Sequence, residues 1–421
     1  MERYNEYKES GVQWLGEIPS HWTIMPLKYS GRFCKGKLPS NTNDNCLGKP
    51  IIGASEMNGN MPSVYSEDNS VPQCTQNDIL FLWDGANAGL VSSFHDGIVA
   101  STVTKFTCDN SNIVSTYLYY LEKNYQRYYK ERVGGTTIPH MNSQYIASCP
   151  LLIPSIQEQQ AIADYLDTAT TKIDEAIAQQ QKMIDLLNER KQIIINNAVT
   201  KGLNPDAPMK DSGVDWIGKI CKNWRMYRLK HLLKTNLMYG ANESAESEET
   251  SYPRYIRITD IDENGKLKPD TFRSLEPLKA EPYLLTRGDI LFARSGATAG
   301  KTYLFDEDIK ACFAGYLIKA QVSNKLLSRY LMYYTRSGIY DQWKNSIFIQ
   351  ATIQNIGADK YANLRIPLPT IEEQKTIVSY LDTETMKIDK VLDTHKRQIS
   401  LLQERKQIII NDVVTGKVKV S

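Results

Sequence analysis

Residues 296–302, Gly-Ala-Thr-Ala-Gly-Lys-Thr, are the stretch of this sequence that comes nearest to a known chemical site, because they resemble a phosphate-binding loop. Such a loop needs four residues between its first glycine and the Gly-Lys-Thr, so that successive backbone amides surround the phosphate. Only three are present, and Ser295 occupies the position of the required glycine. A matching stretch, residues 85–90, has Leu90 in place of the lysine. The spacing therefore argues against a nucleotide site.

Both stretches can instead be interpreted as loops that follow strands. Their small residues would let the backbone come close to a ligand, and their differing polar residues would let two copies bind different ligands. A tight turn that simply requires glycine is the alternative interpretation.

The residues of other catalytic chemistries are missing from the sequence. The five histidines and seven cysteines have no metal-ligand spacing, and no Gly-x-Ser-x-Gly stands on a predicted strand. The chain contains no Pro-Pro, so it lacks the Asn/Asp-Pro-Pro-aromatic tetrapeptide of amino-methyltransferases. We therefore expect no catalytic residues, no metal site and no cofactor on this chain.

The length and composition of the chain limit its domain number, partners and location only broadly. A length of 421 residues predicts two to four domains, and a net charge of +2 neither requires nor excludes a polyanionic partner. No run approaches the ~20 apolar residues that span a bilayer, and no basic segment followed by an apolar one stands at the start. We expect a cytoplasmic protein that does not contact a membrane.

Tyrosine is abundant, with 25 residues, and several lie between positions 117 and 129 among lysines and arginines. Such a cluster could stack on nucleic-acid bases. The spacing is helical, however, and favours an aromatic helix face packed on the globule.

The elements that would position these residues occur twice. A Ser-Gly-Val-x-Trp-x-Gly motif at residues 10–16 returns at 212–218, and Glu-Arg-Lys-Gln-Ile-Ile-Ile-Asn at 189–196 returns at 404–411. The offset between the copies grows from 202 to 215 and is constant from Thr137 and Thr352 onward. A repeat of this length indicates a duplicated domain.

Each copy has two sections. The first, about 150 residues rich in Gly, Pro and short apolar runs, predicts a mixed globule of short strands and turns. The second, residues 155–201 and 370–415, predicts one helix of about 65 Å that begins with a capping box, Ser155–Glu158 or Thr370–Glu373. Apolar residues recur in it every seven positions, as in a coiled-coil seam. The predicted seam consists of Leu166, Ile173, Gln180, Leu187 and Ile194, with Leu381, Ile388, His395, Leu402 and Ile409 in the second copy.

Ile162, Ala169, Ala176 and Met183 form a companion row beside the first seam. Because an isolated helix would expose these rows, we expect the two helices to pack against each other, with Gln180 and His395 fixing the register. The alternative is that each helix lies on its own globule. The predicted domains are residues 1–153, 154–203, 204–368 and 369–417.

The doubled order of these motifs resembles the specificity subunit of type I restriction-modification enzymes. The resemblance rests on the opening Ser-Gly-x-x-Trp-x-Gly, on Pro-x-x-x-Glu-Gln-x-x-Ile-x-x-Tyr-Leu-Asp at 154–167 and 369–382, and on the Glu-Arg-Lys-Gln helix ends. The second opening motif departs slightly, with Ile220 and Cys221 in place of Ile18 and Pro19.

The resemblance implies an α+β fold of two similar target recognition globules, each followed by a long helix. The helices would form an antiparallel coiled coil with pseudo-two-fold symmetry and would set the gap between two halves of an asymmetric DNA target. It also implies two modification subunits that methylate adenine and carry S-adenosylmethionine, and restriction subunits that use ATP and Mg. The chain itself would recognise double-stranded DNA without catalysis.

Polar residues on loops that differ between the copies are the candidates for reading bases, since Arg suits guanine and Asn or Gln suits adenine. An ordinary surface or turn position is the alternative for each. The candidates are Asn58, Asn60, Asn87, Thr136, Thr137, His140 and Asn142 in the first copy, and Arg257, Thr259, Arg294, Thr298, Lys301, Gln350, Thr352 and Gln354 in the second. The rival functions are a stand-alone DNA methyltransferase or nuclease, and a purely structural coiled-coil adaptor.

Overall fold

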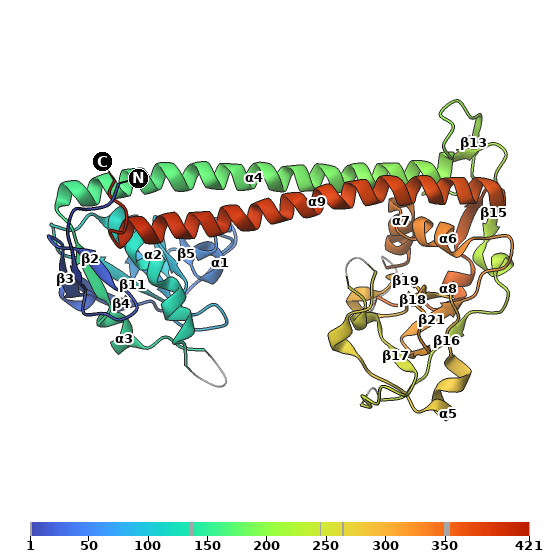
Figure 1. Ribbon diagram of the computed structural model, residues 1–421, viewed down its shortest axis with the longest axis horizontal. Helices are drawn as coiled ribbons and strands as arrows, with labels where there is room; N and C mark the ends of the chain where they lie inside the picture. The colour runs from blue at the N-terminus through green and yellow to red at the C-terminus, as the bar shows by residue number, and fades with distance from the viewer. Residues whose placement is uncertain (1, 135–138, 245, 263–264, 349–353, 421) are drawn as a thin grey trace. The chain divides into compact units, whose positions relative to one another are not determined.

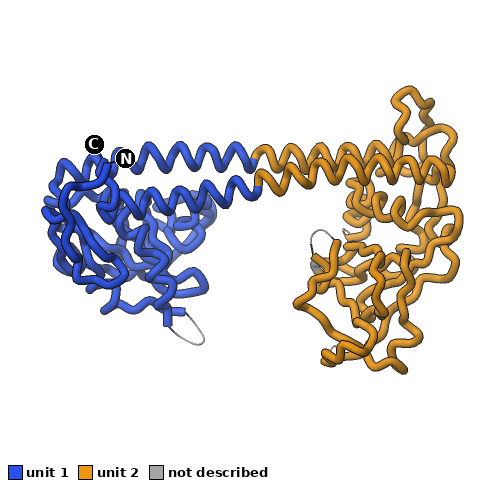
Figure 2. The backbone as a smooth tube through the Cα atoms, in the orientation of Figure 1, with its two compact units in different colours: residues 1–181, 396–421 blue, residues 182–395 orange. Residues whose placement is uncertain are grey.

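The computed structural model describes residues 2–134, 139–244, 246–262, 265–348 and 354–420. The chain forms two compact units, residues 1–181 with 396–421 (unit 1) and residues 182–395 (unit 2), which Figure 2 distinguishes by colour. Each unit contains one globule and a part of both long helices, α4 (Ile156–Lys201) and α9 (Ile371–Val414) (Figure 1). The two units are defined by residue contacts, and the division between them falls within both long helices. The predicted boundaries at 153, 203 and 368 instead separate successive segments of the chain. Those boundaries stay a prediction.

The globule of unit 1 is built on an antiparallel four-stranded sheet in the order β4-β11-β8-β9. A second four-stranded sheet, β6-β5-β10-β7, includes the parallel pair β5 and β10. Two separate antiparallel pairs, β1-β2 and β12-β3, complete the globule. The strands are β1 (Tyr7–Glu9), β2 (Glu17–Pro19), β3 (Thr23–Pro26), β4 (Gly31–Lys35), β5 (Lys49–Ile52), β6 (Tyr65–Ser66), β7 (Gln73–Cys74), β8 (Ile79–Leu82), β9 (Val91–Ser92), β10 (Gly97–Val99), β11 (Val103–Cys108) and β12 (Pro150–Ile153). The helices are α1 (Ala54–Met57), α2 (Ser115–Glu131) and α3 (Ser143–Ala147).

The globule of unit 2 repeats the principal sheet as β16-β21-β18-β19, again antiparallel. A parallel pair, β17-β20, stands where unit 1 has its second sheet, beside the pairs β13-β14 and β15-β22. The strands are β13 (Met209–Asp211), β14 (Lys219–Cys221), β15 (Arg225–Arg228), β16 (Met238–Tyr239), β17 (Arg254–Ile256), β18 (Ile290–Ala293), β19 (Thr302–Leu304), β20 (Ala311–Phe313), β21 (Leu317–Ala320) and β22 (Arg365–Leu368). The helices are α5 (Pro277–Ala280), α6 (Ser328–Tyr334), α7 (Gly338–Phe348) and α8 (Ala358–Ala362).

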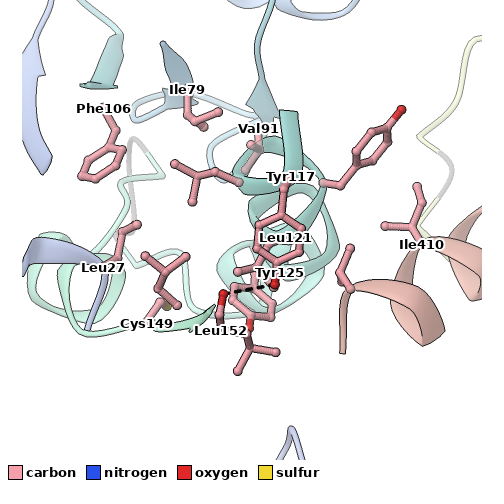
Figure 3. Close-up of a cluster of buried hydrophobic side chains, with 14 of the residues drawn as sticks. Leu27, Ile79, Val91, Phe106, Tyr117, Leu121, Tyr125, Cys149, Leu152 and Ile410 are labelled. Carbon is pink, nitrogen blue, oxygen red and sulfur yellow. Dashed lines mark hydrogen bonds between the residues drawn. The ribbon is translucent and has the colours of Figure 1, made fainter. Parts of the chain in front are cut away.

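The clustered tyrosines form buried helix faces, as the helical spacing favoured. Tyr117, Tyr125 and Tyr129 of α2 lie in the core of unit 1, and Tyr330 and Tyr334 of α6 lie in that of unit 2. Figure 3 shows Tyr117 and Tyr125 among apolar side chains from the sheet and from α9, with the Tyr117 hydroxyl donating to the backbone carbonyl of Leu152 at 3.1 Å. The ring faces are therefore occupied by packing and are unavailable for stacking on bases.

Each globule packs on the start of one long helix and on the end of the other. The core of unit 1 contains Ile162 and Leu166 of α4 together with Ile410 and Val414 of α9. The core of unit 2 contains the equivalent positions, namely Ile195, Ala198 and Val199 of α4 with Ile377, Val378 and Leu381 of α9. The helices therefore pack both on a globule and against each other, and within each unit they run antiparallel. The α+β class and the packed pair of long helices are confirmed.

An ion pair between the long helices recurs in both units at equivalent positions. Lys406 Nζ lies 2.6 Å from an Asp174 carboxylate oxygen in unit 1, and Lys191 Nζ lies 2.6 Å from an Asp389 carboxylate oxygen in unit 2. Both pairs are partly exposed, so each contributes little stability and mainly favours one register.

The seam positions differ in burial along the helices. Leu166, Ile173, Leu381 and Ile388, close to the globules, are buried. The other six, Gln180, Leu187, Ile194, His395, Leu402 and Ile409, are half-buried. The companion row was wrong at Met183, whose side chain is 44% exposed, because a helix with 3.6 residues per turn rotates away from a strict seven-residue row.

Candidate nucleic-acid interface

The repeated Glu-Gln-x-x-Ile-x-x-Tyr-Leu-Asp motif joins each helix to its globule. The side-chain oxygen of buried Gln159 accepts from the Val114 amide at 2.9 Å, and its amide group donates to the carbonyls of Asn112 and Pro154. Gln374 makes the same three bonds in unit 2, to Leu327, Lys325 and Pro369. The Tyr120 hydroxyl donates to Asp167, as the Tyr333 hydroxyl does to Asp382, at 2.7 Å each. These polar residues are structural and leave the long helices without a chemical site there.

The capping boxes at the helix starts were predicted correctly in one copy only. Thr370 and Glu373 exchange both bonds, with each backbone amide donating to the other's side chain. In unit 1 the Glu158 amide donates to Ser155, but the Glu158 carboxylate instead accepts from the Trp22 indole at 3.1 Å and contacts His21. Unit 2 has the equivalent indole bond, from Trp224 to Glu373 at 3.4 Å, but has Asn223 at the position of His21.

Two of the predicted base readers, His140 and Arg294, lie at one end of the principal sheet of their units, which we call the sheet end. At this end β4 and β8 finish and β11 begins, and in unit 2 β16 and β18 finish and β21 begins. The sheet end of unit 1 carries Lys35, Trp83, Asp84, Thr102 and His140, and that of unit 2 carries Tyr239, Arg294, Ser295, Tyr316 and Asn355 at the equivalent positions.

The backbone of the two sheet ends is the same. The amide of Trp83 donates to the carbonyl of Thr102 at 2.8 Å, and that of Arg294 donates to the carbonyl of Tyr316 at 2.9 Å. The glycine that follows each strand, Gly85 or Gly296, donates to a segment that comes from far along the chain, at Pro139 or Gln354. A single scaffold therefore presents two different sets of side chains.

The glycines of these loops are needed by the turn. Gly85 has φ 106° and Gly296 has φ 76°, in the left-handed region that disfavours residues with a Cβ, and open space surrounds both. Lys301, which completes the resemblance to a phosphate loop, donates to the backbone carbonyl of Ile261 at 3.1 Å. The tight-turn interpretation is thus sufficient for the glycines, and the stretch does not form a phosphate site.

In unit 1 the sheet end is an internally bonded polar cluster. Asp84 accepts from Lys35 Nζ at 3.0 Å and from Nδ1 of His140, while Nε2 of His140 accepts from the Trp83 indole at 3.3 Å. Partial burial raises the pKa of Asp84, but the bonds from Lys35 and His140 outweigh it, so the pKa lies below its ordinary value. Asp84 is therefore a carboxylate at neutral pH, and both ring nitrogens of His140 are engaged.

The other first-copy candidates are divided between structural and exposed positions. Asn142 accepts from the Tyr145 amide at the start of α3, and Asn58 and Asn60 donate back to α1 and to Ser55. Asn87 is exposed at the tip of the glycine loop, where its side chain makes no hydrogen bond to the described residues. Thr136 and Thr137 lie outside the described residues.

In unit 2 the predicted base-reading cations are mostly occupied. Arg257 forms a two-pronged pair with buried Asp260, at 2.7 and 3.1 Å, and Lys301 is bonded as above. Arg294 instead places its guanidinium carbon 5.2 Å from the centre of the Tyr239 ring. Thr259 and Gln354 are exposed and Thr298 is half-buried, whereas Gln350 and Thr352 lie outside the described residues.

A cavity of about 360 Å³ opens beside the sheet end of unit 2. Its lining includes Asn242, Thr259, Ser295, Tyr316 and Leu317. Tyr316 is 68% exposed, which is unusual for so large a ring. Sequence patterns did not single out Lys35, Tyr239, Tyr316 or Asn355. The register of the repeat could have found one of them, because Asn355 stands 215 residues after the candidate His140.

Among the described residues, no three His, Cys, Asp or Glu side chains come together in a way that could hold a metal ion. No helix in the described ranges is both long and apolar enough to cross a bilayer.

The family model for the type I restriction modification DNA specificity domain matches residues 19–184 and again residues 221–406. The chain belongs to this family. Its members are the DNA-recognition components of type I restriction-modification enzymes and not the catalytic subunits.

The chain is similar along nearly its full length to curated specificity subunits. It is 26% identical to the MjaVIII specificity subunit of Methanocaldococcus jannaschii, over 98% of this chain and 97% of that one. It is 21% identical to the EcoBI specificity subunit of Escherichia coli, over 89% and 81% of the two chains. A solved chain from a study of complex assembly and conformational transition in a type I restriction-modification system has a TM-score of 0.70 at 15% identity, over 95% of this chain and 99% of that one. The last likeness concerns the fold alone.

Proposed function

We propose that this chain is a specificity subunit that reads a bipartite, asymmetric sequence in double-stranded DNA, one half with each unit. The observation that carries the proposal is the sheet end, where one backbone scaffold presents Lys35, Asp84 and His140 in unit 1 and Arg294, Ser295 and Asn355 in unit 2. Base edges in the major groove differ in their donors and acceptors, so two different sets of side chains select two different half-sites. The long helices would keep the gap between the half-sites at a set number of base pairs.

We further propose that two modification subunits bind the long helices, one for each unit. An exposed apolar row recurs there at equivalent positions, with Leu186 and Ile193 on α4 in unit 2 and Leu401 and Ile408 on α9 in unit 1, each 50–54% exposed. Exposed apolar rows on a helix are typical of faces that another helix covers. Catalysis, with S-adenosylmethionine, ATP and Mg, would reside in the modification and restriction subunits.

Exchange of residues 1–150 for the equivalent segment of a relative tests the division of labour. Sequencing of methylated adenines in cells that carry the exchanged chain and its modification subunit should show one altered half-site, with the other half-site and the gap unchanged. Alteration of both half-sites would contradict the proposal.

Disruption of each apolar row tests the partner sites. Leu186→Gln with Ile193→Gln, or Leu401→Gln with Ile408→Gln, should each reduce the assembly by one modification subunit in native mass spectrometry, and the combination should remove both. The matched control is Asn188→Ala with Gln403→Ala, which changes equivalent exposed positions on the other side of the same helices, away from the rows. Full assembly of the combined variant would exclude the rows as the partner sites.

The rival enzymatic function has a direct test as well. The purified chain should transfer no methyl group from S-adenosylmethionine to DNA until a modification subunit is added, and transfer by the chain alone would favour the rival.

A further inference from the structure

Arg294 differs from the neighbouring cations Arg257 and Lys301 of unit 2 in its partners among the described residues. Its guanidinium makes no ion pair and donates no hydrogen bond to any described residue, whereas Arg257 is held by Asp260 and Lys301 by a backbone carbonyl. A guanidinium carries five N–H donors in a planar fork. Those donors therefore have no partner among the described residues.

The guanidinium is held in place by packing on an aromatic ring. It lies over Tyr239, whose own hydroxyl accepts a hydrogen bond at 3.0 Å from the backbone amide of Ala358, the first residue of α8. Tyr239 also ends β16, where it pairs with Ile318. The Tyr239 ring is thus held by its strand in the sheet and by the bond from α8 to its hydroxyl. A guanidinium stacked on such a ring keeps the N–H groups at its own edge available for hydrogen bonds.

Neighbours of Arg294 line a cavity, and Arg294 itself is half-buried beside it and outside its lining. Ser295 follows it in the chain and Tyr316 accepts its backbone hydrogen bond, and both line the cavity of about 360 Å³. Asn242 and Thr259 add polar atoms to a lining that also contains Leu317.

The equivalent position in unit 1 is unlike this one. Trp83 stands there, only 7% exposed, and its indole nitrogen is bonded to His140. At this position of the scaffold, unit 2 therefore has a half-buried arginine stacked on a tyrosine, where unit 1 has a buried tryptophan.

We propose that Arg294, positioned by Tyr239, reads a guanine in the half-site bound by unit 2, by donating two hydrogen bonds to its O6 and N7 in the major groove. This inference rests on the proposed function. Two-pronged Arg–guanine contacts discriminate against the wrong base pair by about tenfold or more. Lysine, a point charge on a flexible stem, does not reproduce the planar fork.

The test uses the full chain with its modification subunit and duplexes that carry each of the four base pairs at every position of the target mapped for the wild type. Arg294→Lys should lower the preference for one G·C pair in one half-site by about tenfold and leave the other half-site unchanged. Tyr239→Ala should relax the preference at that same pair, while Tyr239→Phe should relax it less, because the ring remains. Arg287→Gln is the matched control, since Arg287 precedes β18 at its opposite end and pairs with Asp306 there.

Three results would overturn the inference. In one, Arg294→Lys keeps the full preference and Arg294→Gln weakens binding equally for all sequences with a shallower salt dependence, which would identify a phosphate contact. In another, the position that relaxes is not a G·C pair. In the third, no position relaxes. A wild-type assembly without any bipartite preference would instead overturn the proposed function, so the two failures are distinguishable.

Discussion

The junction between helix and globule is nearly identical in the two units, whereas the sheet end differs at every compared position. At the junction Gln159 and Gln374 make the same three hydrogen bonds, and Tyr120 and Tyr333 contact equivalent aspartates. At the sheet end Lys35 corresponds to Tyr239, Trp83 to Arg294, and His140 to Asn355 in the register of the repeat. Both regions contain polar side chains, and in both regions the backbone hydrogen bonds are equivalent in the two units.

The difference separates polar residues that hold the fold from polar residues that select a ligand. A buried amide with all its bonds made cannot change without leaving orphan backbone groups, so both copies keep it. A partly exposed side chain at the end of a strand can change without that cost. The two regions should therefore respond to substitution in opposite ways, with stability lost at the junction and specificity changed at the sheet end.

The largest loss of stability is expected at the junction. Gln159→Leu leaves the Val114 amide and two carbonyls without their partner and should lower the free energy of unfolding of unit 1 by about 3 kcal/mol. Gln374→Leu should cost unit 2 a similar amount. Urea denaturation, with hydrogen exchange to assign the unit, measures both. Gln160→Leu, at an exposed neighbouring position, should change stability by less than about 0.5 kcal/mol, and equal effects at 159 and 160 would remove the contrast.

Substitution of Glu122, a position at which the cores of the two units differ, should raise the free energy of unfolding, by less than the junction substitutions lower it. Burial raises the pKa of Glu122 to about 7, against the lowering effect of the Tyr129 hydroxyl bond. Because the folded pKa lies above the ordinary 4.5, the stability of unit 1 should be greatest at acidic pH and fall as pH rises between about 4.5 and 7. Glu122→Gln should abolish this fall and stabilise unit 1 by about 2 kcal/mol at pH 8.

Unit 2 provides the control for this titration, because Thr335 stands at the equivalent position. Hydrogen exchange of the backbone amides of α2 and α6 across pH, after correction for intrinsic exchange, measures the two units separately. A parallel pH response in both helices would exclude Glu122 as the source.

Removal of a charge at the sheet end should barely affect stability. Lys35→Ala breaks the pair with Asp84, whose partners are 52% and 22% exposed, and should cost less than about 1 kcal/mol. The same variant should alter the preferred half-site of unit 1 without affecting that of unit 2, in the duplex-binding assay described above. Strong destabilisation with unchanged sequence preference would place Lys35 with the junction residues and not with the readers.

The smallest effect is expected at the repeated ion pair between the long helices. Lys406→Glu and Asp174→Lys should each cost unit 1 about 0.5 kcal/mol, and their combination should recover part of the loss. The same cycle on Lys191 and Asp389 should give a similar coupling in unit 2. A coupling of zero in both cycles would mean that the seam alone sets the register.

Much of the fold was predictable from residue patterns because the patterns are local. The absence of Gly and Pro over some 45 residues and the seven-residue recurrence of Leu166 and Ile173 predicted α4, and the second copy predicted α9. The interpretation of the tyrosines was confirmed for the same reason, since helical spacing places Tyr117, Leu121 and Tyr125 on the buried side of α2.

The candidate site was harder to predict from the sequence, because several of its hydrogen-bond partners come from distant segments. Both ring nitrogens of His140 bond to residues from a distant segment, Trp83 and Asp84. Arg257, in contrast, pairs with Asp260 only three residues away, and the sequence pattern did not indicate that pairing. Lys35 and Tyr239 were overlooked because a residue at the end of a short strand carries no distinguishing pattern. The reading roles of the candidates remain predictions.

The sequence by itself determined the duplication, the long helices and the membership of a family of DNA-specificity domains, because each depends on repeated or periodic residues that are visible along the chain. Only the tertiary structure decided which polar side chains already have partners and which, like Arg294 over Tyr239, make no hydrogen bond or ion pair among the described residues. For His140 and Arg294 that distinction depends on segments more than fifty residues apart meeting at one end of a sheet, and no local pattern encodes such a meeting.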